Sequence, residues 1–338
     1  MSNPENRVYP VVSVIIPTFN RAHLVRDTLN SVISQSYQKW ECIVVDDGST
    51  DATLAIVEEY TNDKDRFSCY HRPITAKKGP SACRNFGLSV AQGKYVVFLD
   101  SDDVLAKDCL EKRVSFFEVN QNLDFVVFSM GWFKTIDKLE YYPDRKVFKG
   151  TREQTIKHFI AHAYPWNTTR PIYNKTFVEK NGGFNENLTV YTDPEMALRI
   201  LLKSNPTYDV IDETDCYYRV DNHYHDKYED KVFQEKICIN FLKFKKMTFE
   251  MLSKSEKRIF ANELKYEFIK SQIYFNGFHS SDLLSEMKSL YSKHVQFTLI
   301  EHLYLKLLKL SLSNLNRKGM FTIKTYISNY FKSKTIQE

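Results

Sequence analysis

The stretch VVFLDSDDVL, residues 96–105, runs four apolar residues directly into three carboxylates. An unbroken apolar run of this length predicts a parallel strand that is buried on both faces. Asp100, Asp102 and Asp103 then crowd the end of that strand, where like charges repel one another and lose water. We therefore expect a cation to bind among these acids.

Three other short apolar runs lie upstream of this stretch. They are VVSVIIP (11–17), ECIVV (41–45) and FSCYH (67–71). Because helical stretches separate these runs, the sequence predicts an α/β fold, a mainly parallel, twisted sheet flanked by helices in the Rossmann-like manner. Ligands of such sheets bind beyond the carboxyl ends of the strands. Residues 17–20, 46–49 and 100–103 all follow strands, so their acids should converge on one cleft.

The composition is that of a large globular protein, since 43% of the 338 residues are hydrophobic. Residues 1–10 lack the apolar core of a secretory signal, and no stretch approaches the roughly 20 apolar residues of a membrane span. The 6 cysteines form no CxxC pair, which argues against a disulfide framework or a structural zinc site. We expect a cytoplasmic protein with reduced thiols.

Charge is distributed unevenly along the chain. Residues 231–338 carry 19 Lys and Arg against 9 Asp and Glu, whereas residues 1–230 have a net charge of −5. Near the same point the apolar residues change to a helical spacing, as in Phe260, Leu264 and Phe268. We therefore predict an α/β domain over residues 1–225 and a basic, mainly helical C-terminal region over residues 226–338.

Two interpretations of the basic C-terminal region stay open. It could make a peripheral contact with the anionic inner face of a membrane. Alternatively, its amphipathic helices could pack on the α/β domain or on a second subunit. Nucleic acid is a poor partner, because the positive charge lies apart from the predicted sheet and no binding motif accompanies it.

Carboxylates at strand ends suit a hard divalent cation. In a Mg²⁺ or Mn²⁺ site the protein usually supplies one or two Asp oxygens. Several waters and the phosphates of a substrate complete the coordination. An Asp beside the metal can instead accept hydrogen bonds from ribose hydroxyls. Asp102 and Asp103 could also cap a helix beginning near residue 106, but capping leaves the second acid cluster at 46–47 unexplained.

Four motifs occur in a specific order and spacing. They are VSVIIPTFNR (12–21), VVDDGSTD (44–51), GPSACRNFGLSVAQGKYVVFLDSDDVL (79–105) and GGFNENLTVYTDPEMALRI (182–200). Together they resemble the motifs of family 2 nucleotide-sugar glycosyltransferases, which have the GT-A fold. The resemblance covers roughly residues 11–220, and we place no motif in residues 231–338.

The resemblance implies a nucleotide-diphosphate sugar as donor and places its contacts at the strand ends and beyond. These contacts are Pro17, Thr18, Asp46, Asp47, Arg84, Asp100, Asp102 and Arg219. Asp47 matches an acid that binds the base edge, and the five fixed donors of Arg84 suit the base or its phosphates. Arg219 matches an arginine that helps to hold the diphosphate.

The resemblance also implies a Mn²⁺ or Mg²⁺ cofactor, with Asp102 and Asp103 as metal contacts of the DxD element. The family often carries His two positions after the arginine that corresponds to Arg219. Asp221 stands there in this chain. His223 is therefore the nearby candidate for a further metal or phosphate contact.

Asp193 stands where the family carries its catalytic base. In an inverting transfer the acceptor hydroxyl attacks the anomeric carbon as the diphosphate leaves, so a carboxylate must take the hydroxyl proton. The metal stabilises the charge that grows on the diphosphate. Thr192 replaces the usual Glu, and Glu195 follows two positions after Asp193, so Glu195 is the alternative base.

The implied function is the transfer of a hexosyl or N-acetylhexosaminyl group from a UDP-sugar to a glycan or lipid-linked acceptor in cell-surface polysaccharide synthesis. The main alternative is a non-catalytic sugar-nucleotide or glycan-binding module of the same fold. A phosphoacceptor signalling domain also has acids at strand ends, but it leaves the Asp193 region without a role. Oxidoreduction is disfavoured because no GxGxxG follows the first strand.

Overall fold

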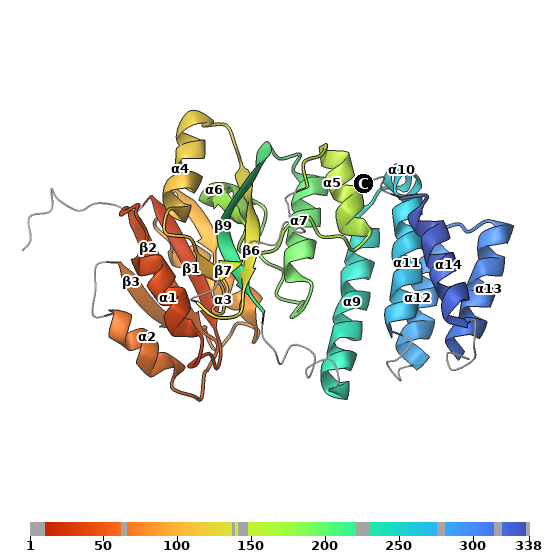
Figure 1. Cartoon of the computed structure of the whole chain (residues 1–338), viewed down its shortest axis with the longest axis horizontal. Helices are drawn as coiled ribbons and strands as arrows, with labels where there is room; N and C mark the ends of the chain where they lie inside the picture. The colour runs from red at the N-terminus through yellow and green to blue at the C-terminus, as the bar shows by residue number, and fades with distance from the viewer. Residues whose placement is uncertain are drawn as a thin grey trace, which may run out of the picture. The chain divides into compact units, whose positions relative to one another are not determined.

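The computed structural model describes residues 11–61, 66–136, 139–140, 148–220, 230–275, 281–313 and 320–335 (Figure 1). The chain divides into two compact units. The first, the sheet unit, comprises residues 1–149, 166–196 and 204–222. The second, the helical unit, comprises residues 150–165, 197–203 and 223–338. The domain boundary near residue 225 stays a prediction, and two segments of the helical unit precede it.

The sheet unit is built on one mixed sheet. Its strands are β1 (Val12–Thr18), β2 (Trp40–Asp46), β3 (Phe67–His71), β4 (Tyr95–Phe98), β5 (Val104–Leu105), β6 (Phe125–Phe133), β7 (Leu139–Glu140), β8 (Pro171–Asn174) and β9 (Tyr208–Arg219). Their order is β3-β2-β1-β4-β8-β6-β9-β5, and β7 pairs with β6. The first four strands in this order are parallel, whereas β8 runs antiparallel to both β4 and β6. The predicted α/β class is confirmed, with the parallel character concentrated in β1–β4.

The parallel half of the sheet brings three strand ends to one edge. β1 pairs with β2 so that Thr18 lies opposite Asp46, and Ile15 of β1 lies opposite Phe98 of β4. All residues of β1 are buried, as expected for a strand that is covered on both faces. The loop that contains Asp100, Asp102 and Asp103 therefore leaves the sheet at the same edge as Thr18 and Asp46.

Helices of the sheet unit flank this sheet. They are α1 (Val25–Ile33), α2 (Thr53–Thr61), α3 (Pro80–Val90), α4 (Cys109–Val119), α6 (Lys175–Lys180) and the first turn of α7 (Thr192–Lys203). α3 approaches the sheet closely, because a Cβ at Gly87 would lie only 2.5 Å from Ile15 Cγ2. The helix expected near residue 106 begins at Cys109 instead. Ala106 N donates to Asp215 O at 2.8 Å, which extends the pairing of β5 with β9 by one residue.

The helical unit contains the predicted C-terminal helices. Its elements are α5 (Arg152–Ile160), the rest of α7, α9 (Lys231–Met251), α10 (Lys254–Ile259), α11 (Ala261–Phe275), α12 (Ser281–His294), α13 (Leu299–Ser313) and α14 (Met320–Lys332). One apolar cluster joins Ile269 of α11, Leu308 of α13 and Phe331 of α14. None of the helices in the described ranges combines the length and the apolarity needed to cross a membrane.

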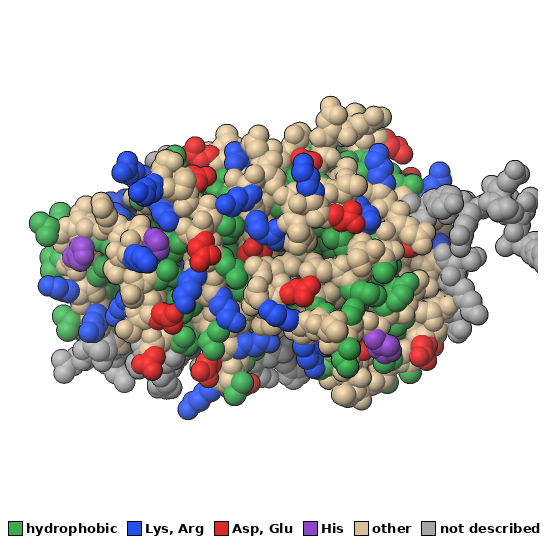
Figure 2. Space-filling model, turned by 180° about the vertical axis from the view of Figure 1, so that it is seen from behind, with side chains coloured by type: hydrophobic (Ala, Val, Ile, Leu, Met, Phe, Trp, Pro, Cys, Tyr) green, Lys and Arg blue, Asp and Glu red, His purple; other side chains and the backbone are tan. Residues whose placement is uncertain are grey.

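Figure 2 shows one face of the protein, on which Lys and Arg side chains are scattered among acidic and hydrophobic ones. Basic side chains on that face do not gather into one broad patch. A scattered distribution of this kind gives no strong positive field over the visible surface.

Candidate active site

The first part of the site lies where β1 and β2 end. Asp46 Oδ2 accepts hydrogen bonds from Gly48 N and Ser49 N, both at 2.9 Å, which closes the turn after β2. Asp46 Oδ1 and Thr18 Oγ1 are buried and have no hydrogen-bond partner among the described residues. Pro17 is buried in β1 next to Thr18. Because buried polar atoms are rarely left unpaired, these two oxygens call for a partner beyond the described residues.

Asp47 forms an ion pair that the sequence did not reveal. Its carboxylate accepts a hydrogen bond from Arg72 Nε, and both side chains are largely buried. Arg72 also donates to the carbonyl groups of Pro73 and Ala76. The pair thus holds the loop after β3 against the end of β2. Arg72 could have been found from its position, because it directly follows a strand that ends at the same edge as β2.

Arg84 lies on α3 with only 4% of its surface exposed. Its Nη2 donates to Asp100 Oδ1, and its guanidinium carbon lies 4.9 Å from the centre of the Phe184 ring. Burial opposes its charge, but Asp100 and Asp193 outweigh burial and raise the pKa of Arg84. Nε and Nη1 are buried without a partner among the described residues. Two nitrogens of a charged group thus lack a partner among the described residues.

Asp102 and Asp103 face in different directions. The Asp102 side chain is 36% exposed, and its carboxylate lies 3.6 Å from Arg21 Nη2. Asp103 is fully buried: its Oδ2 accepts from Thr169 Oγ1 at 3.0 Å and its Oδ1 from Arg219 N at 3.2 Å. Burial, with Asp102 and Asp100 nearby, raises the pKa of Asp103 well above its usual value.

Asp100 accepts a hydrogen bond from Arg84 and is influenced by the charges of Asp193 and Asp102. Burial raises its pKa, the Asp193 and Asp102 carboxylates add to that rise, and Arg84 opposes it. The electrostatic influence of Asp193 on both Asp100 and Arg84 places the predicted base in the same cluster as the DxD loop. The structure thus brings together residues predicted from separate motifs.

Asp193 lies in the first turn of α7 and is held by two hydrogen bonds. Its Oδ2 accepts from Thr168 N and its Oδ1 from Thr192 Oγ1, both at 3.0 Å. Asp193 is partly exposed, whereas Glu195 is buried with 2% of its surface exposed. Tyr191, two residues before Asp193, has a φ of 63°, a left-handed conformation that is uncommon outside glycine.

Asn85, which follows Arg84 on α3, holds the turn at Gly182 and Gly183 that precedes Asp193. Asn85 Nδ2 donates to Phe184 O at 2.9 Å, and Asn85 Oδ1 accepts from Phe184 N at 2.8 Å. A Cβ at Gly183 would lie 2.5 Å from Asn85 Oδ1. The turn therefore requires glycine both for space and for its φ of 58°.

Arg219, predicted to hold a diphosphate, is engaged within the protein. Its Nη2 donates to Asp27 Oδ2 at 2.7 Å and its Nε to Asp102 O at 3.0 Å. Its guanidinium lies 4.4 Å from the centre of the Phe133 ring. In this arrangement Arg219 fixes the backbone of the DxD loop, and its diphosphate contact stays a prediction.

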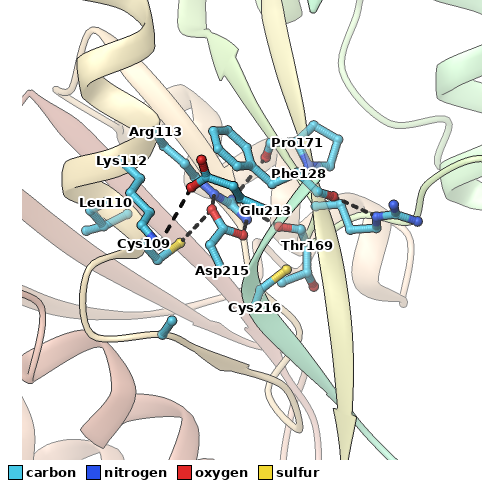
Figure 3. A network of polar contacts seen from close by, with 12 residues as sticks. Cys109, Leu110, Lys112, Arg113, Phe128, Thr169, Pro171, Glu213, Asp215 and Cys216 are labelled. Carbon is cyan, nitrogen blue, oxygen red and sulfur yellow. Dashed lines mark hydrogen bonds and ion pairs between the residues drawn. The ribbon is translucent and has the colours of Figure 1, made fainter. Parts of the chain in front are cut away.

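A buried ion pair supports the segment that holds Asp193 (Figure 3). Arg113 of α4 and Asp215 of β9 are both fully buried and form two hydrogen bonds, at 2.7 and 2.8 Å. Arg113 Nη1 also donates to Thr169 O at 3.0 Å. Thr169 is therefore held at its carbonyl by Arg113 and at its hydroxyl by Asp103. The preceding residue, Thr168, presents its N–H to Asp193.

A divalent cation fits this site as a group shared with a substrate. Within the described ranges no three His, Cys, Asp or Glu side chains form a metal-binding group. Mg²⁺ and Mn²⁺ sites commonly use one or two carboxylates, with phosphates and waters as the other ligands. The Asp102 carboxylate is partly exposed and makes an ion pair with Arg21, whereas both Asp103 oxygens accept internal hydrogen bonds. His223 lies outside the described residues.

The fold is that of the GT-A class. The chain superimposes on Staphylococcus aureus TarS, residues 1–349, with a TM-score of 0.63 and 21% identity, covering 97% of this chain and 93% of that chain. For the mannosyltransferase PcManGT from Pyrobaculum calidifontis the TM-score is 0.56 at 19% identity, covering 96% and 85%. At these identities the likeness establishes the fold alone.

Residues 13–177 match the family model described as glycosyl transferase family 2. This part of the chain belongs to that family. It is 44% identical over 107 residues to the putative teichuronic acid biosynthesis glycosyltransferase TuaG of Bacillus subtilis, covering 32% of this chain and 42% of the relative.

A Campylobacter jejuni relative is named GalNAc(5)-diNAcBac-PP-undecaprenol beta-1,3-glucosyltransferase. It is 41% identical over 101 residues, covering 30% of this chain and 32% of the relative. The match thus spans less than half the length of both curated relatives.

Proposed function

We propose that this protein is an inverting, metal-dependent glycosyltransferase of cell-surface polysaccharide synthesis. It moves a hexosyl or N-acetylhexosaminyl group from a nucleotide-diphosphate sugar, with UDP as the nucleotide, to a glycan or lipid-linked acceptor. It acts at the inner face of the membrane, where a lipid-linked acceptor is presented.

One observation carries this proposal. Buried polar atoms of Thr18, Asp46 and Arg84 lack hydrogen-bond partners among the described residues. Thr18 and Asp46 lie at the same edge of the sheet as the loop of the partly exposed Asp102, and the partly exposed Asp193 influences Arg84. A ligand with ring or ribose donors and acceptors and a negative diphosphate satisfies the unpaired oxygens and the unpaired guanidinium donors together.

The residues divide the chemistry between them. Thr18, Asp46 and Asp47 bind the nucleoside. The two unpaired nitrogens of Arg84 donate hydrogen bonds that orient the sugar nucleotide. Asp102 would hold the Mn²⁺ or Mg²⁺, which would supply positive charge to the departing diphosphate. The oxygen of the acceptor hydroxyl forms a bond to the anomeric carbon while the bond from that carbon to the diphosphate breaks. Asp193 takes the proton of this hydroxyl. The two hydrogen bonds to Asp193 fix the direction in which its carboxylate faces.

The relatives support the donor, the metal and the acceptor class. TarS has been solved with UDP and with UDP-GlcNAc, and PcManGT with GDP-Man and Mn²⁺. The Campylobacter jejuni relative is named for a glucosyl transfer to an undecaprenol-linked glycan. These names favour a UDP-sugar first and a GDP-sugar second as the donor to be tested.

The test is calorimetric titration of the full chain with UDP, GDP and dTDP, in Mn²⁺ and in chelator. We expect metal-dependent binding of UDP, weakened in Asp102→Asn and unchanged in Asp108→Asn, an exposed acid paired with Lys112. Binding without turnover of any UDP-sugar would favour the non-catalytic module. Failure of all three nucleotides to bind would overturn the donor assignment.

A further inference from the structure

Helix α13 of the helical unit has apolar side chains on two opposite sides. On the inner side, Leu308 is buried against the cluster that contains Ile269 and Phe331. The other side carries five aliphatic residues that the fold leaves in solvent, including Leu310, which is 58% exposed. The first four, called the outer stripe, are Leu299, Ile300, Leu303 and Leu307, with exposed fractions of 91%, 59%, 55% and 37%.

The outer stripe is continuous along the helix. Leu299, Leu303 and Leu307 are spaced by four residues and therefore lie on one side of α13. A packed inner side already accounts for the stability of this helix, so the second apolar side is not needed for folding. Contiguous exposed apolar surface of this kind marks an interaction site.

The charges beside the outer stripe identify the partner. Lys306 and Lys309 are exposed on the same helix. Glu301, the acid of α13, is buried and paired with Lys265 Nζ at 2.8 Å. No Asp or Glu occurs from residue 302 to residue 337. The exposed side of α13 is thus apolar and positive, without a carboxylate to repel an anionic surface.

We infer that the outer stripe docks on an anionic lipid bilayer, with its leucines in the acyl boundary and Lys306 and Lys309 among the headgroups. A symmetric contact between two copies of the chain is less suited, because it would place the lysines of both stripes in one interface without a carboxylate of α13 to pair with them. The purpose of this docking rests on the proposed function, since it presents the enzyme to a lipid-linked acceptor.

The test is co-sedimentation of the full chain with vesicles of phosphatidylglycerol and phosphatidylcholine, and with pure phosphatidylcholine. We expect binding to the anionic vesicles, weakened by salt, and about tenfold weaker for Leu299→Glu/Leu303→Glu. The matched control is Val119→Glu/Ile259→Glu, which adds the same charge at residues that are 82% and 54% exposed. The control should sediment like the parent chain.

Three results would overturn the inference. The parent chain could fail to bind anionic vesicles, the stripe and control variants could behave alike, or light scattering could show a dimer that only the stripe variant loses. Because sedimentation needs no turnover, these results are separate from the fate of the proposed function. Metal-dependent UDP binding should be equal in the parent chain and both variants.

Discussion

At the scale of single residues, we predict that sugar transfer depends on the Asp193 carboxylate. Asparagine keeps an oxygen for Thr168 N but cannot accept a proton, so Asp193→Asn should lower the rate of sugar transfer by about 10²- to 10⁴-fold. Its affinity for UDP should stay close to that of the parent chain. The control is Glu195→Gln, which removes the alternative base. If Glu195→Gln abolished transfer while Asp193→Asn did not, Glu195 would be the base.

Thr169 is predicted to act as a positioning residue for Asp193. Thr169→Val removes the hydroxyl that donates to Asp103 Oδ2 at 3.0 Å and leaves a buried oxygen unpaired. We expect a loss of about 1–3 kcal/mol in the free energy of unfolding. We also expect kcat to fall more than KM rises, because the adjoining Thr168 N–H orients the base.

Two variants separate positioning by Thr169 from its contribution to stability. Thr169→Ser restores the hydroxyl and should recover kcat. Thr248→Val removes a buried hydroxyl that donates to Phe244 O at 2.9 Å within α9. It should lower stability without changing kcat. A Thr169→Val enzyme with unchanged kcat would exclude the positioning role.

At the scale of elements, the glycine turn before α7 allows a matched pair of variants. Gly182 and Gly183 both have positive φ, at 76° and 58°, so alanine at either should cost about 1 kcal/mol of folding stability. Only Gly183→Ala also places a Cβ 2.5 Å from Asn85 Oδ1, whereas Gly182 has no atom within 4 Å of such a Cβ. Urea denaturation should therefore rank Gly183→Ala as the less stable variant.

The same turn connects stability with donor binding. Asn85 adjoins Arg84 on α3, so a displaced Asn85 should move the guanidinium and weaken UDP binding in Gly183→Ala. Gly182→Ala should bind UDP like the parent chain. Equal UDP affinities in the two variants would show that the contact of Asn85 with this turn does not position Arg84.

The elements that could be predicted from the sequence are those with a local signal. β1–β4 lie within a few residues of the predicted apolar runs, and α1–α3 occupy the helical stretches expected after the first three runs. Unbroken apolar runs and helical spacing mark these elements directly. The direction of β8 could not be predicted, since a short strand has the same pattern in either direction. The ion pair of Arg113 with Asp215 joins residues 102 positions apart, and no local pattern encodes it.

At the scale of the whole molecule, the two units can be followed by different signals. The three tryptophans, Trp40, Trp132 and Trp166, all belong to the sheet unit. Tryptophan fluorescence therefore reports unfolding of the sheet unit, whereas far-ultraviolet circular dichroism also reports the helical unit. A change confined to the helical unit should appear in the second signal and not in the first.

Titration of Glu267 should give a stability change that is confined to the helical unit. Glu267 is buried on α11, 3.5 Å from Lys245 Nζ, and accepts a hydrogen bond from Tyr291. Burial raises its pKa from 4.5 to about 7, although Lys245 opposes the rise. Between these pH values the unfolded chain loses the proton and the folded chain keeps it, so stability falls as the pH rises. The unfolding free energy of the parent chain, relative to Glu267→Gln, should fall by about 3 kcal/mol across this window. Glu286→Gln, at an exposed ion pair with Lys246, should give no such slope, and a flat difference for Glu267→Gln would contradict the raised pKa.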